Sequence, residues 1–321
     1  MLDFAVSAEK QGFEFICISD HFHPWFHKDG CAGHAWIWLG AAGAKTSNVT
    51  LGTGVTTSIN RYHPAIIAQA FATLDELYPG RIFLGIGAGE AMNEMPMAPV
   101  NSKWPPHGER LAQTIEAVKI IRSLWERDFC DFSGKYYTLR QANLYTKPKA
   151  RIPIYFAAIG PNALRAAGLY GDALMCGGRD RERVSSMFSI YDGAVRESGR
   201  RPEDMPRMVE MKVSYHEDCE KALDSLSMWR PPKASASGLN IDDPRELDRL
   251  REGVDPKILS RDVYTNMDPL VAEIERLIDL GFTDIQVGSN SPDEEKFIRD
   301  FGTKALPYLK DKYRSKQRLG H

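Results

Sequence analysis

The sequence predicts an α/β protein with a parallel sheet, built either as a (β/α)₈ barrel of the TIM type or as a doubly wound sheet. Two observations support this class. Short apolar runs alternate with amphipathic stretches along all 321 residues, and this order favours repeated strand–helix units. The apolar runs show little polar–apolar alternation, which indicates strands that are buried on both faces of a parallel sheet.

Seven short apolar runs are the candidate strands. They lie at 13–19, 49–57, 81–89, 152–160, 173–178, 209–216 and 283–289. Amphipathic stretches predict helices at 3–11, 35–46, 64–78, 108–126, 162–170, 180–198, 268–280 and 293–313. Pro64 suits the first turn of its helix because that position needs no backbone N–H. The chain starts within the first helix, so we expect the first strand of an eight-stranded barrel to be missing here and to lie upstream of Met1.

Three segments break this rhythm and are predicted to be excursions from a single domain spanning 1–321. They cover about 91–107, 127–150 and 217–262. The second contains a predicted hairpin, and the third is polar and rich in proline. None of them carries a strong apolar core of its own. We therefore expect a single barrel with insertions after its strands 4 and 7.

Composition excludes several classes of protein. Apolar residues make up 43% and charged residues 26%, as in ordinary globular chains. A net charge of −2 gives no reason to expect nucleic acid or an anionic membrane as partner. No apolar run approaches the ~20 residues that a bilayer requires. Five scattered cysteines without CxxC spacing fit reduced thiols in a cytoplasmic protein.

A histidine-rich segment follows the first candidate strand. It reads SDHFHPWFHKDGCAGH at 19–34, and strand ends form the active-site face of such barrels. His21 follows the strand directly, and an imidazole with a pKa near ~6.5 suits a general base. Trp25 is either a pocket wall or a packing residue. His21 and His23 also allow a metal site, which would need ligands from other strand ends.

A glycine-rich segment, GIGAGEAMNE at 85–94, ends the third candidate strand. Its spacing differs from the GxGxxG dinucleotide fingerprint, so it predicts only that the backbone passes close to another group. Glu90 and Glu94 lie beside it at the expected mouth of the barrel. A carboxyl group in a partly apolar pocket has a raised pKa and can act as an acid. The alternative is that both are solvated loop carboxylates.

Two later strand ends also carry glycine. Gly160 precedes Pro161, and the free N–H groups of a helix that starts there are typical of phosphate or carboxylate binding. Gly177 and Gly178 precede Arg179. That arginine is either a second contact for an anion or a surface residue.

Several of these segments together resemble the coenzyme F420-dependent branch of the bacterial-luciferase-like superfamily. They are SDHFHPW, LGTGVTT with RYHPAIIAQAFATL, PGRIFLGIGAGEAMNE, GKYYTL and the IGP turn. The resemblance covers the whole chain, is strongest over 19–126, and is nearest to the alcohol and glucose-6-phosphate dehydrogenases of that branch. It implies a (β/α)₈ barrel, commonly a homodimer, that binds the deazaflavin at its C-terminal mouth.

The resemblance also implies the site residues. His21 matches the base that takes the hydroxyl proton, Glu90 matches the acid beside the ring, and Trp25 matches an aromatic residue at the reacting centre. Gly54 and Val55 match a cis peptide that supports the ring. Further cofactor contacts are implied at Asp20, Thr57, Ala88, Gly89, Asn93, Ile159, Gly160, Asn162 and Ala163.

The substrate is less clearly implied. Sugar-phosphate enzymes of this branch hold phosphate with three basic positions, which read Asp180, Gly238 and Arg261 in this sequence. Because this pattern is not preserved, we expect a small or uncharged alcohol in place of a sugar phosphate. Gly177, Arg179 and Arg261 remain as weak candidates for substrate contacts.

The leading hypothesis is an F420-dependent dehydrogenase that transfers hydride from an alcohol or sugar hydroxyl carbon to the deazaflavin, with no metal. Two alternatives keep the fold: an F420-dependent methylenetetrahydromethanopterin reductase and an FMN-dependent luciferase-like monooxygenase, FMN being the less expected cofactor. Two alternatives belong to other classes: a metal-dependent hydrolase built on His21 and His23, and a non-catalytic cofactor-binding protein.

Overall fold

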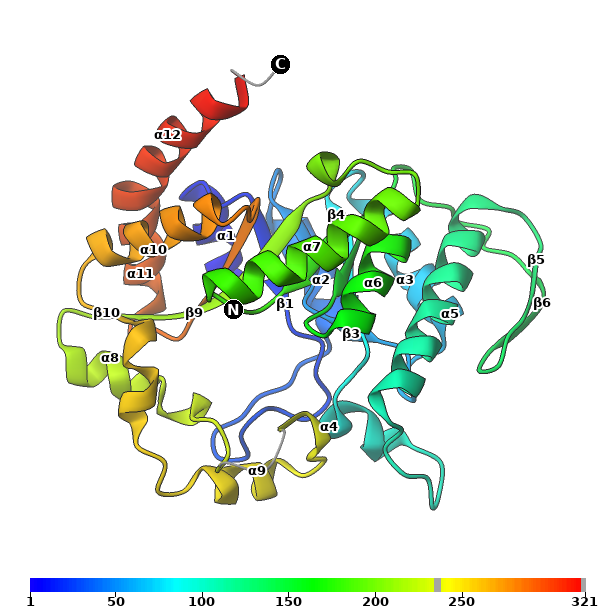
Figure 1. The fold of residues 1–321 in the computed structure, drawn as a ribbon, viewed down its shortest axis with the longest axis horizontal. Helices are drawn as coiled ribbons and strands as arrows, with labels where there is room; N and C mark the ends of the chain where they lie inside the picture. Colours follow the sequence, from blue (N-terminus) through cyan, green and yellow to red (C-terminus); the bar gives the residue numbers. More distant parts are fainter. Residues whose placement is uncertain (234–237, 319–321) are drawn as a thin grey trace.

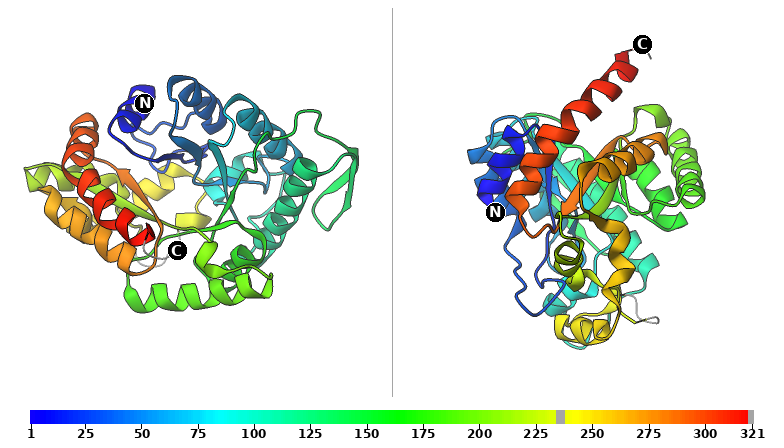
Figure 2. Two further views of the ribbon diagram at one scale, coloured as in Figure 1. Left: turned by 90° about the horizontal axis from the view of Figure 1, so that it is seen from above. Right: turned by 90° about the vertical axis from the view of Figure 1, so that its left-hand side faces the viewer.

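The computed structural model describes residues 1–233 and 238–318 and shows a nearly closed parallel barrel surrounded by helices (Figures 1 and 2). The barrel strands are β1 (Phe15–Ile18), β2 (Thr50–Thr53), β3 (Thr56–Thr57), β4 (Ile82–Gly87), β7 (Ile154–Ala157), β8 (Ala173–Cys176), β9 (Arg207–Tyr215), β10 (Val263–Tyr264) and β11 (Asp284–Ser289). The helices are α1 (Leu2–Lys10), α2 (Ala35–Lys45), α3 (Pro64–Leu77), α4 (Ala91–Glu94), α5 (His107–Glu126), α6 (Pro161–Tyr170), α7 (Arg181–Glu197), α8 (Cys219–Ser225), α9 (Pro244–Arg251), α10 (Met267–Asp279), α11 (Glu294–Asp300) and α12 (Leu306–Arg318).

The sheet runs in the order β1-β2-β4-β7-β8-β9, and β11 pairs with the other side of β9. Every one of these pairs is parallel, and neighbours in the sheet follow one another along the chain. The barrel prediction is therefore confirmed, and the doubly wound alternative is wrong. All strand ends that carry the predicted site residues consequently meet at one mouth.

The predicted strand at 49–57 is interrupted. It forms β2 and β3, which pair with successive parts of β4, and the peptide bond between them, Gly54–Val55, is cis. The implied cis peptide is thus present. A Cβ atom on Gly54 would lie 2.6 Å from the Cys17 sulfur, so no larger residue fits at this position.

The barrel is open on one side. β1 and β11 are only partly buried along their whole lengths, whereas β4 and β8 are buried throughout. Among the described residues no strand joins the free edges of β1 and β11.

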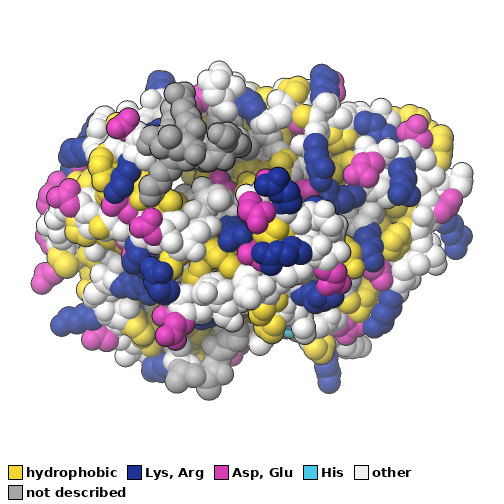
Figure 3. All heavy atoms as spheres, turned by 45° about the horizontal axis from the view of Figure 1, so that its top comes forward, with side chains coloured by type: hydrophobic (Ala, Val, Ile, Leu, Met, Phe, Trp, Pro, Cys, Tyr) yellow, Lys and Arg dark blue, Asp and Glu magenta, His cyan; other side chains and the backbone are white. Residues whose placement is uncertain are grey.

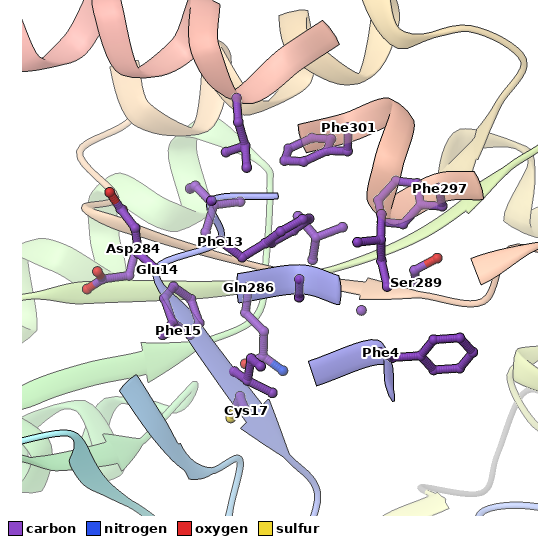
Figure 4. A pocket seen from close by; sticks show the side chains of 18 of the residues that line it. Phe4, Phe13, Glu14, Phe15, Cys17, Asp284, Gln286, Ser289, Phe297 and Phe301 are labelled. Atoms are coloured by element: carbon purple, nitrogen blue, oxygen red, sulfur yellow. The ribbon is translucent and has the colours of Figure 1, made fainter. Parts of the chain in front are cut away.

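A cavity of about 660 Å³ lies along this open side (Figure 4). Apolar residues of β1, β11 and the adjoining helices line most of it. Its aromatic lining consists of Phe4, Phe13, Phe15, Trp38, Phe297, Phe301 and Tyr313; the five phenylalanines are labelled in Figure 4.

The three segments predicted as excursions connect strands and helices of the barrel. The segment 91–107 follows β4 and begins with α4, and 127–150 contains the predicted hairpin of β5 (Cys130–Ser133) and β6 (Thr138–Ala142). The third excursion carries α8 and α9, and its residues 234–237 lie outside the described residues. α9 lies below the mouth in the view of Figure 1, close to α4.

Two further observations concern the surface. No helix in the described part of the chain is long and apolar enough to cross a membrane. Basic and acidic side chains are interspersed over the face shown in Figure 3, so that face presents no extended field of one sign.

Candidate active site

Two loops that are distant in the sequence meet at the mouth of the barrel. β1 leads into Asp20 and His21, and β4 leads through Gly89 into Glu90, which is the residue before α4. The Nε2 atom of His21 lies 3.8 Å from the Oε2 atom of Glu90. The two residues predicted to handle protons are therefore neighbours.

Asn93 of α4 connects these two residues. Its Oδ1 accepts a hydrogen bond from the backbone N–H of Phe22 at 2.8 Å. Its Nδ2 lies 3.0 Å from Nδ1 of His21 and donates to Oε2 of Glu90 at 3.2 Å. Asn93 was predicted only as a cofactor contact, but the structure shows it holding the imidazole and the carboxyl group together.

Trp25 forms a wall beside the imidazole. Its ring centroid lies 6.0 Å from that of His21, and its backbone oxygen accepts a hydrogen bond from Arg251 at 2.6 Å. The indole packs against a small apolar cluster that includes Met92 and Leu247. Helix α9 of the third excursion thus helps to form the apolar part of the mouth.

Asp20 is buried, and its carboxylate is used within the protein. Thr56 Oγ1 donates to it at 2.7 Å, and the guanidinium of Arg61 forms an ion pair with it and also donates to its backbone oxygen. The side chains of Asp20 and Arg61 are 1% and 7% exposed. Sequence reasoning did not identify Arg61, and the implied contact of Asp20 with a cofactor stays a prediction.

Both interpretations of Glu94 are wrong. It is neither a solvated carboxylate nor an acid at the mouth, because its side chain is fully buried. It accepts hydrogen bonds from the hydroxyl of Thr57 and from the backbone N–H groups of Asn60 and Arg61. Glu94 therefore holds the segment after β3 in place, and the Thr57 hydroxyl is already occupied by it.

The surroundings of His21 and Glu90 favour the uncharged form of each side chain. Burial, and to a lesser extent the carboxylate of Glu210, raise the pKa of Glu90 to about 7, against the opposing effect of the Lys212 ammonium. Burial is also the main reason that the pKa of His21 is lowered, and Arg61 adds to this effect. A neutral imidazole thus lies beside a carboxyl group for which both protonation states are accessible near pH 7.

Sequence reasoning missed two charged residues of β9. Glu210 and Lys212 alternate with buried residues, so they lie on the same inward face of the strand as Met208. The ammonium of Lys212 lies 3.2 Å from the ring centroid of Trp229, whose indole N–H donates to Asn290 at 2.7 Å. Burial lowers the pKa of Lys212 to about 8. The signal that could have identified this face is the pair of charged residues at alternate positions of an otherwise mostly apolar strand.

The glycines of the mouth serve two purposes. A Cβ atom on Gly87 would lie 2.8 Å from a methyl group of Val55, so the close approach predicted for β4 is made to the cis peptide segment. Gly89 has a φ of +77°, which favours glycine. A Cβ atom on Gly160 or Gly177 would meet no atom within 4 Å, so these two glycines border open space.

The start of α6 is exposed toward solvent. Its N-cap, Gly160, provides no side-chain hydrogen bond to the helix, and Ile159 and Asn162 are exposed. The free N–H groups of this first turn suit an anion. The side chain of Ala163 is buried in the outer core, which leaves only its backbone for a ligand. The Ala88 backbone oxygen already accepts a hydrogen bond from the side chain of Arg110.

A group of arginines lies at the ends of β8 and β10, around a cavity of about 450 Å³. Arg179 pairs with Asp262 at 2.6 Å, and Arg276 binds Glu273 at 2.7 and 2.8 Å. Arg261 lies 3.7 Å from the same Glu273. The structure therefore brings together Arg179 and Arg261, the weak substrate candidates, but neutralises them with carboxylates.

Two other histidines of the first loop have partners within the protein. His23 Nδ1 lies 3.4 Å from the Asp242 backbone oxygen, and His34 Nε2 lies 3.3 Å from the Tyr62 hydroxyl. In the described ranges, no group of three or more His, Cys, Asp or Glu side chains is arranged to hold a metal ion. The hydrolase alternative therefore has no ligand set there.

Comparison with known proteins adds sequence evidence. Residues 1–259 match the family model described as luciferase-like monooxygenase. The chain is 40% identical over 315 residues to an F420-dependent glucose-6-phosphate dehydrogenase of Intrasporangium calvum, which covers 97% of this chain and 94% of that protein.

Solved structures agree with this result. An F420-dependent secondary alcohol dehydrogenase, in complex with an F420–acetone adduct, matches with a TM-score of 0.89 and 37% identity over 96% of this chain and 94% of that one. An F420-dependent tetrahydromethanopterin reductase of Methanopyrus kandleri matches with a TM-score of 0.76 over 96% and 94% of the two chains. At 22% identity, the second match shows the shared fold alone.

Proposed function

The chain belongs to the luciferase-like monooxygenase family, and from that premise we propose that it is a coenzyme F420-dependent dehydrogenase acting on the CH–OH group of an alcohol or sugar. One observation carries this proposal beyond the likeness to relatives. A neutral His21, a Glu90 with a pKa of about 7, and Asn93 between them form a proton-handling group at the mouth. Oxidation of an alcohol requires removal of one proton and one hydride, and this group of residues can accept the proton.

The residues at the mouth fit the deazaflavin cofactor. Val55 and the cis peptide before it form a support packed against Gly87, and Gly160 and Gly177 border open space that has room for a ligand. The uncapped start of α6 offers N–H groups to the anionic side chain of such a cofactor. When bound, the deazaflavin supplies the carbon that accepts the hydride.

The remaining roles are assigned to the chain's own residues. His21 and Glu90 lie 3.8 Å apart, where both can hydrogen-bond to a substrate hydroxyl and one of them can take its proton. Trp25 excludes water on the side of α9 and borders the reacting centre. The relatives named for F420 support this cofactor over FMN.

The charge of the arginine group favours an uncharged substrate. Arg179, Arg261 and Arg276 face Asp262 and Glu273, so this side of the mouth carries little excess positive charge for a phosphate. The proposed substrate is therefore an alcohol or an unphosphorylated sugar, although the relative from Intrasporangium calvum is named for glucose 6-phosphate.

We also propose that the protein forms a homodimer in a reducing compartment. Ile37, Ile66 and Leu77 are 73%, 51% and 59% exposed on the adjacent helices α2 and α3, and burying them against a second copy would remove apolar surface from water. All five cysteines are free thiols, as the proposed cytoplasmic location requires. Light scattering on the wild type and on Ile37→Lys tests the dimer, which the variant should weaken.

A fluorescence titration with coenzyme F420, run beside FMN, tests the proposed function first. We expect selective binding of F420, followed by its reduction with secondary alcohols or sugars and weaker reduction with sugar phosphates. Binding of FMN alone would move the protein to the monooxygenase group. Binding of F420 without reduction by any alcohol or sugar would contradict the dehydrogenase.

A further inference from the structure

We propose that Asn93 is a positioning residue that fixes the tautomer of His21 with its proton on Nε2, so that His21 donates a hydrogen bond to the substrate hydroxyl and the Glu90 carboxylate accepts the substrate proton. The catalytic consequence rests on the proposed function. The tautomer does not rest on it, because it follows from hydrogen bonds within the protein.

The orientation of the Asn93 amide is determined by a group that can only donate. The backbone N–H of Phe22 points to one end of the amide at a distance of 2.8 Å. Because an N–H needs an acceptor, that end is Oδ1. The NH₂ end of Asn93 is therefore the one that faces Nδ1 of His21 at 3.0 Å and Oε2 of Glu90 at 3.2 Å.

An amide NH₂ group has hydrogens to donate and no lone pair to offer. Nδ1 of His21 must then accept, and in a neutral imidazole the single proton lies on Nε2. The one competing contact is the backbone oxygen of His23, which lies at 3.3 Å and would need a proton on Nδ1. That arrangement would place two N–H groups against each other across the shorter 3.0 Å contact, so it is disfavoured.

The same amide disfavours a fully protonated His21, which would carry a proton on both nitrogens. Burial has the largest effect on the pKa of His21 and lowers it, as does the nearby guanidinium of Arg61, whereas the backbone oxygen of His23 and the carboxylate of Asp20 raise it. Asp20 itself is paired with Arg61. His21 is therefore held neutral with Nε2–H directed toward Glu90.

This tautomer changes which residue accepts the substrate proton. Nε2 cannot accept the hydroxyl proton while it carries one of its own, and Oε2 of Glu90 lies 3.8 Å from it. A hydroxyl bound beside both groups would accept a hydrogen bond from Nε2–H and donate one to the Glu90 carboxylate. The substrate O–H bond then breaks as an O–H bond forms on Glu90. The net result is one proton moved from substrate to Glu90, with the proton on Nε2 of His21 retained.

This proton transfer differs from the roles that the resemblance implies, in which His21 takes the hydroxyl proton and Glu90 starts as an acid. Here Glu90 starts as a carboxylate and becomes the acid. The charged groups that face Glu90 are Glu210, which favours its protonated form, and Lys212, which favours the carboxylate.

The test is the ¹⁵N chemical shifts of the His21 imidazole, measured by long-range ¹H–¹⁵N correlation on the full chain without cofactor at neutral pH. The signals are assigned by their loss in His21→Gln. We expect the pattern of a neutral ring with the proton on Nε2. A neutral ring with the proton on Nδ1, or a charged ring with protons on both nitrogens, would overturn the inference.

Two variants sharpen this measurement. Asn93→Asp replaces the donor by an acceptor of the same shape, so the proton should move to Nδ1 or the ring should become charged. Asn93→Ala removes the donor and leaves the His23 oxygen as the contact of Nδ1. An Nε2–H pattern that persists in both variants would show that Asn93 does not set the tautomer. The wild-type spectrum decides the first question even if a variant fails to fold.

Activity assays separate this inference from the proposed function. If the wild type shows Nε2–H but no alcohol or sugar reduces bound F420, the dehydrogenase fails and the tautomer stands. If alcohols are oxidised and the wild type shows Nδ1–H, the dehydrogenase stands and the role of Asn93 fails. In Asn93→Asp, we expect kcat to fall at least tenfold with an altered pH profile, which a merely structural role would not produce.

Discussion

The two sides of the barrel mouth use charge in opposite ways. On the side formed by β1 and β4, the neutral amide of Asn93 holds an uncharged His21 beside Glu90, whose carboxyl group can gain or lose a proton near pH 7. On the side formed by β8 and β10, Arg179 and Arg276 are bound to carboxylates at 2.6 to 2.8 Å. The first side can accept and donate a proton, whereas on the second side the positive charges of the arginines are offset by carboxylates.

This difference indicates how the two sides divide the work. A carboxyl group with a pKa near the working pH can act as both donor and acceptor in one catalytic cycle. An arginine cannot lose its proton in a protein, so it can only attract or orient a ligand. We therefore expect substitutions on the first side to change turnover, and those on the second side to change which substrate binds.

The largest expected effect is that of Glu90→Gln. The amide keeps the size of the side chain but can no longer accept the substrate proton, so turnover should fall by about 10²–10⁴-fold with F420 affinity nearly unchanged. The measurements are kcat with a reactive alcohol and the F420 dissociation constant. Glu126→Gln, on the exposed end of α5, is the matched control. Unchanged turnover in Glu90→Gln would contradict the proposed role of Glu90 in proton transfer.

The next effect concerns stability. Arg61→Met leaves the buried carboxylate of Asp20 without its cation, which should cost about 3–5 kcal/mol in free energy of unfolding. Arg261→Met removes an arginine that is 59% exposed, for which we expect a change of at most ~1 kcal/mol. Urea denaturation of both variants measures the difference. Equal losses would show that burial does not distinguish the two ion pairs.

A third change tests the electrostatic coupling across the mouth. The positive charge of Lys212 lowers the pKa of Glu90, so Lys212→Met should raise that pKa. Activity that needs the Glu90 carboxylate is gained as pH rises through this pKa, and that limb of the kcat/KM profile should therefore move to higher pH. Lys119→Met, on the exposed face of α5, is the control. A limb that stays in place, or moves to lower pH, would contradict the coupling.

The smallest expected effect is a gain. Glu273→Gln removes the carboxylate shared by Arg179, Arg261 and Arg276, so that side of the mouth gains one positive charge. Partly exposed pairs are worth at most ~1 kcal/mol, which corresponds to an increase of up to about fivefold in affinity for inorganic phosphate. Calorimetric titration with phosphate measures it. Strong phosphate binding by the wild type would show that the arginines are not neutralised.

Much of the fold was predictable because its signals are local. The apolar runs around Ile16, Leu84 and Phe156 became β1, β4 and β7, since a buried parallel strand needs apolar residues on both faces. The run at 49–57 was predicted as one strand, and the cis peptide at Gly54–Val55 divides it into two. His21 and Glu90 were identified because each directly follows a strand.

Other site residues depend on partners distant in the sequence. Arginine is usually exposed in proteins, and only the ion pair with Asp20 in the folded structure explains why Arg61 is buried. Glu94 was assigned to the mouth because it follows Glu90 closely, but α4 turns it inward toward Thr57 and Asn60. No local sequence pattern predicts the burial of Arg61 or that of Glu94.

By itself, the sequence determined the order of strands and helices and the identity of the residues at the strand ends, because hydrophobic periodicity and turn chemistry act over a few neighbouring residues. Only the tertiary structure decided the protonation of those residues. The neutral state and tautomer of His21, the raised pKa of Glu90, and the cancelled charges around Glu273 depend on burial and on distances between separate segments. Electrostatic and hydrogen-bond energies depend on such distances, and these distances are set only once the separate strands have assembled into the barrel.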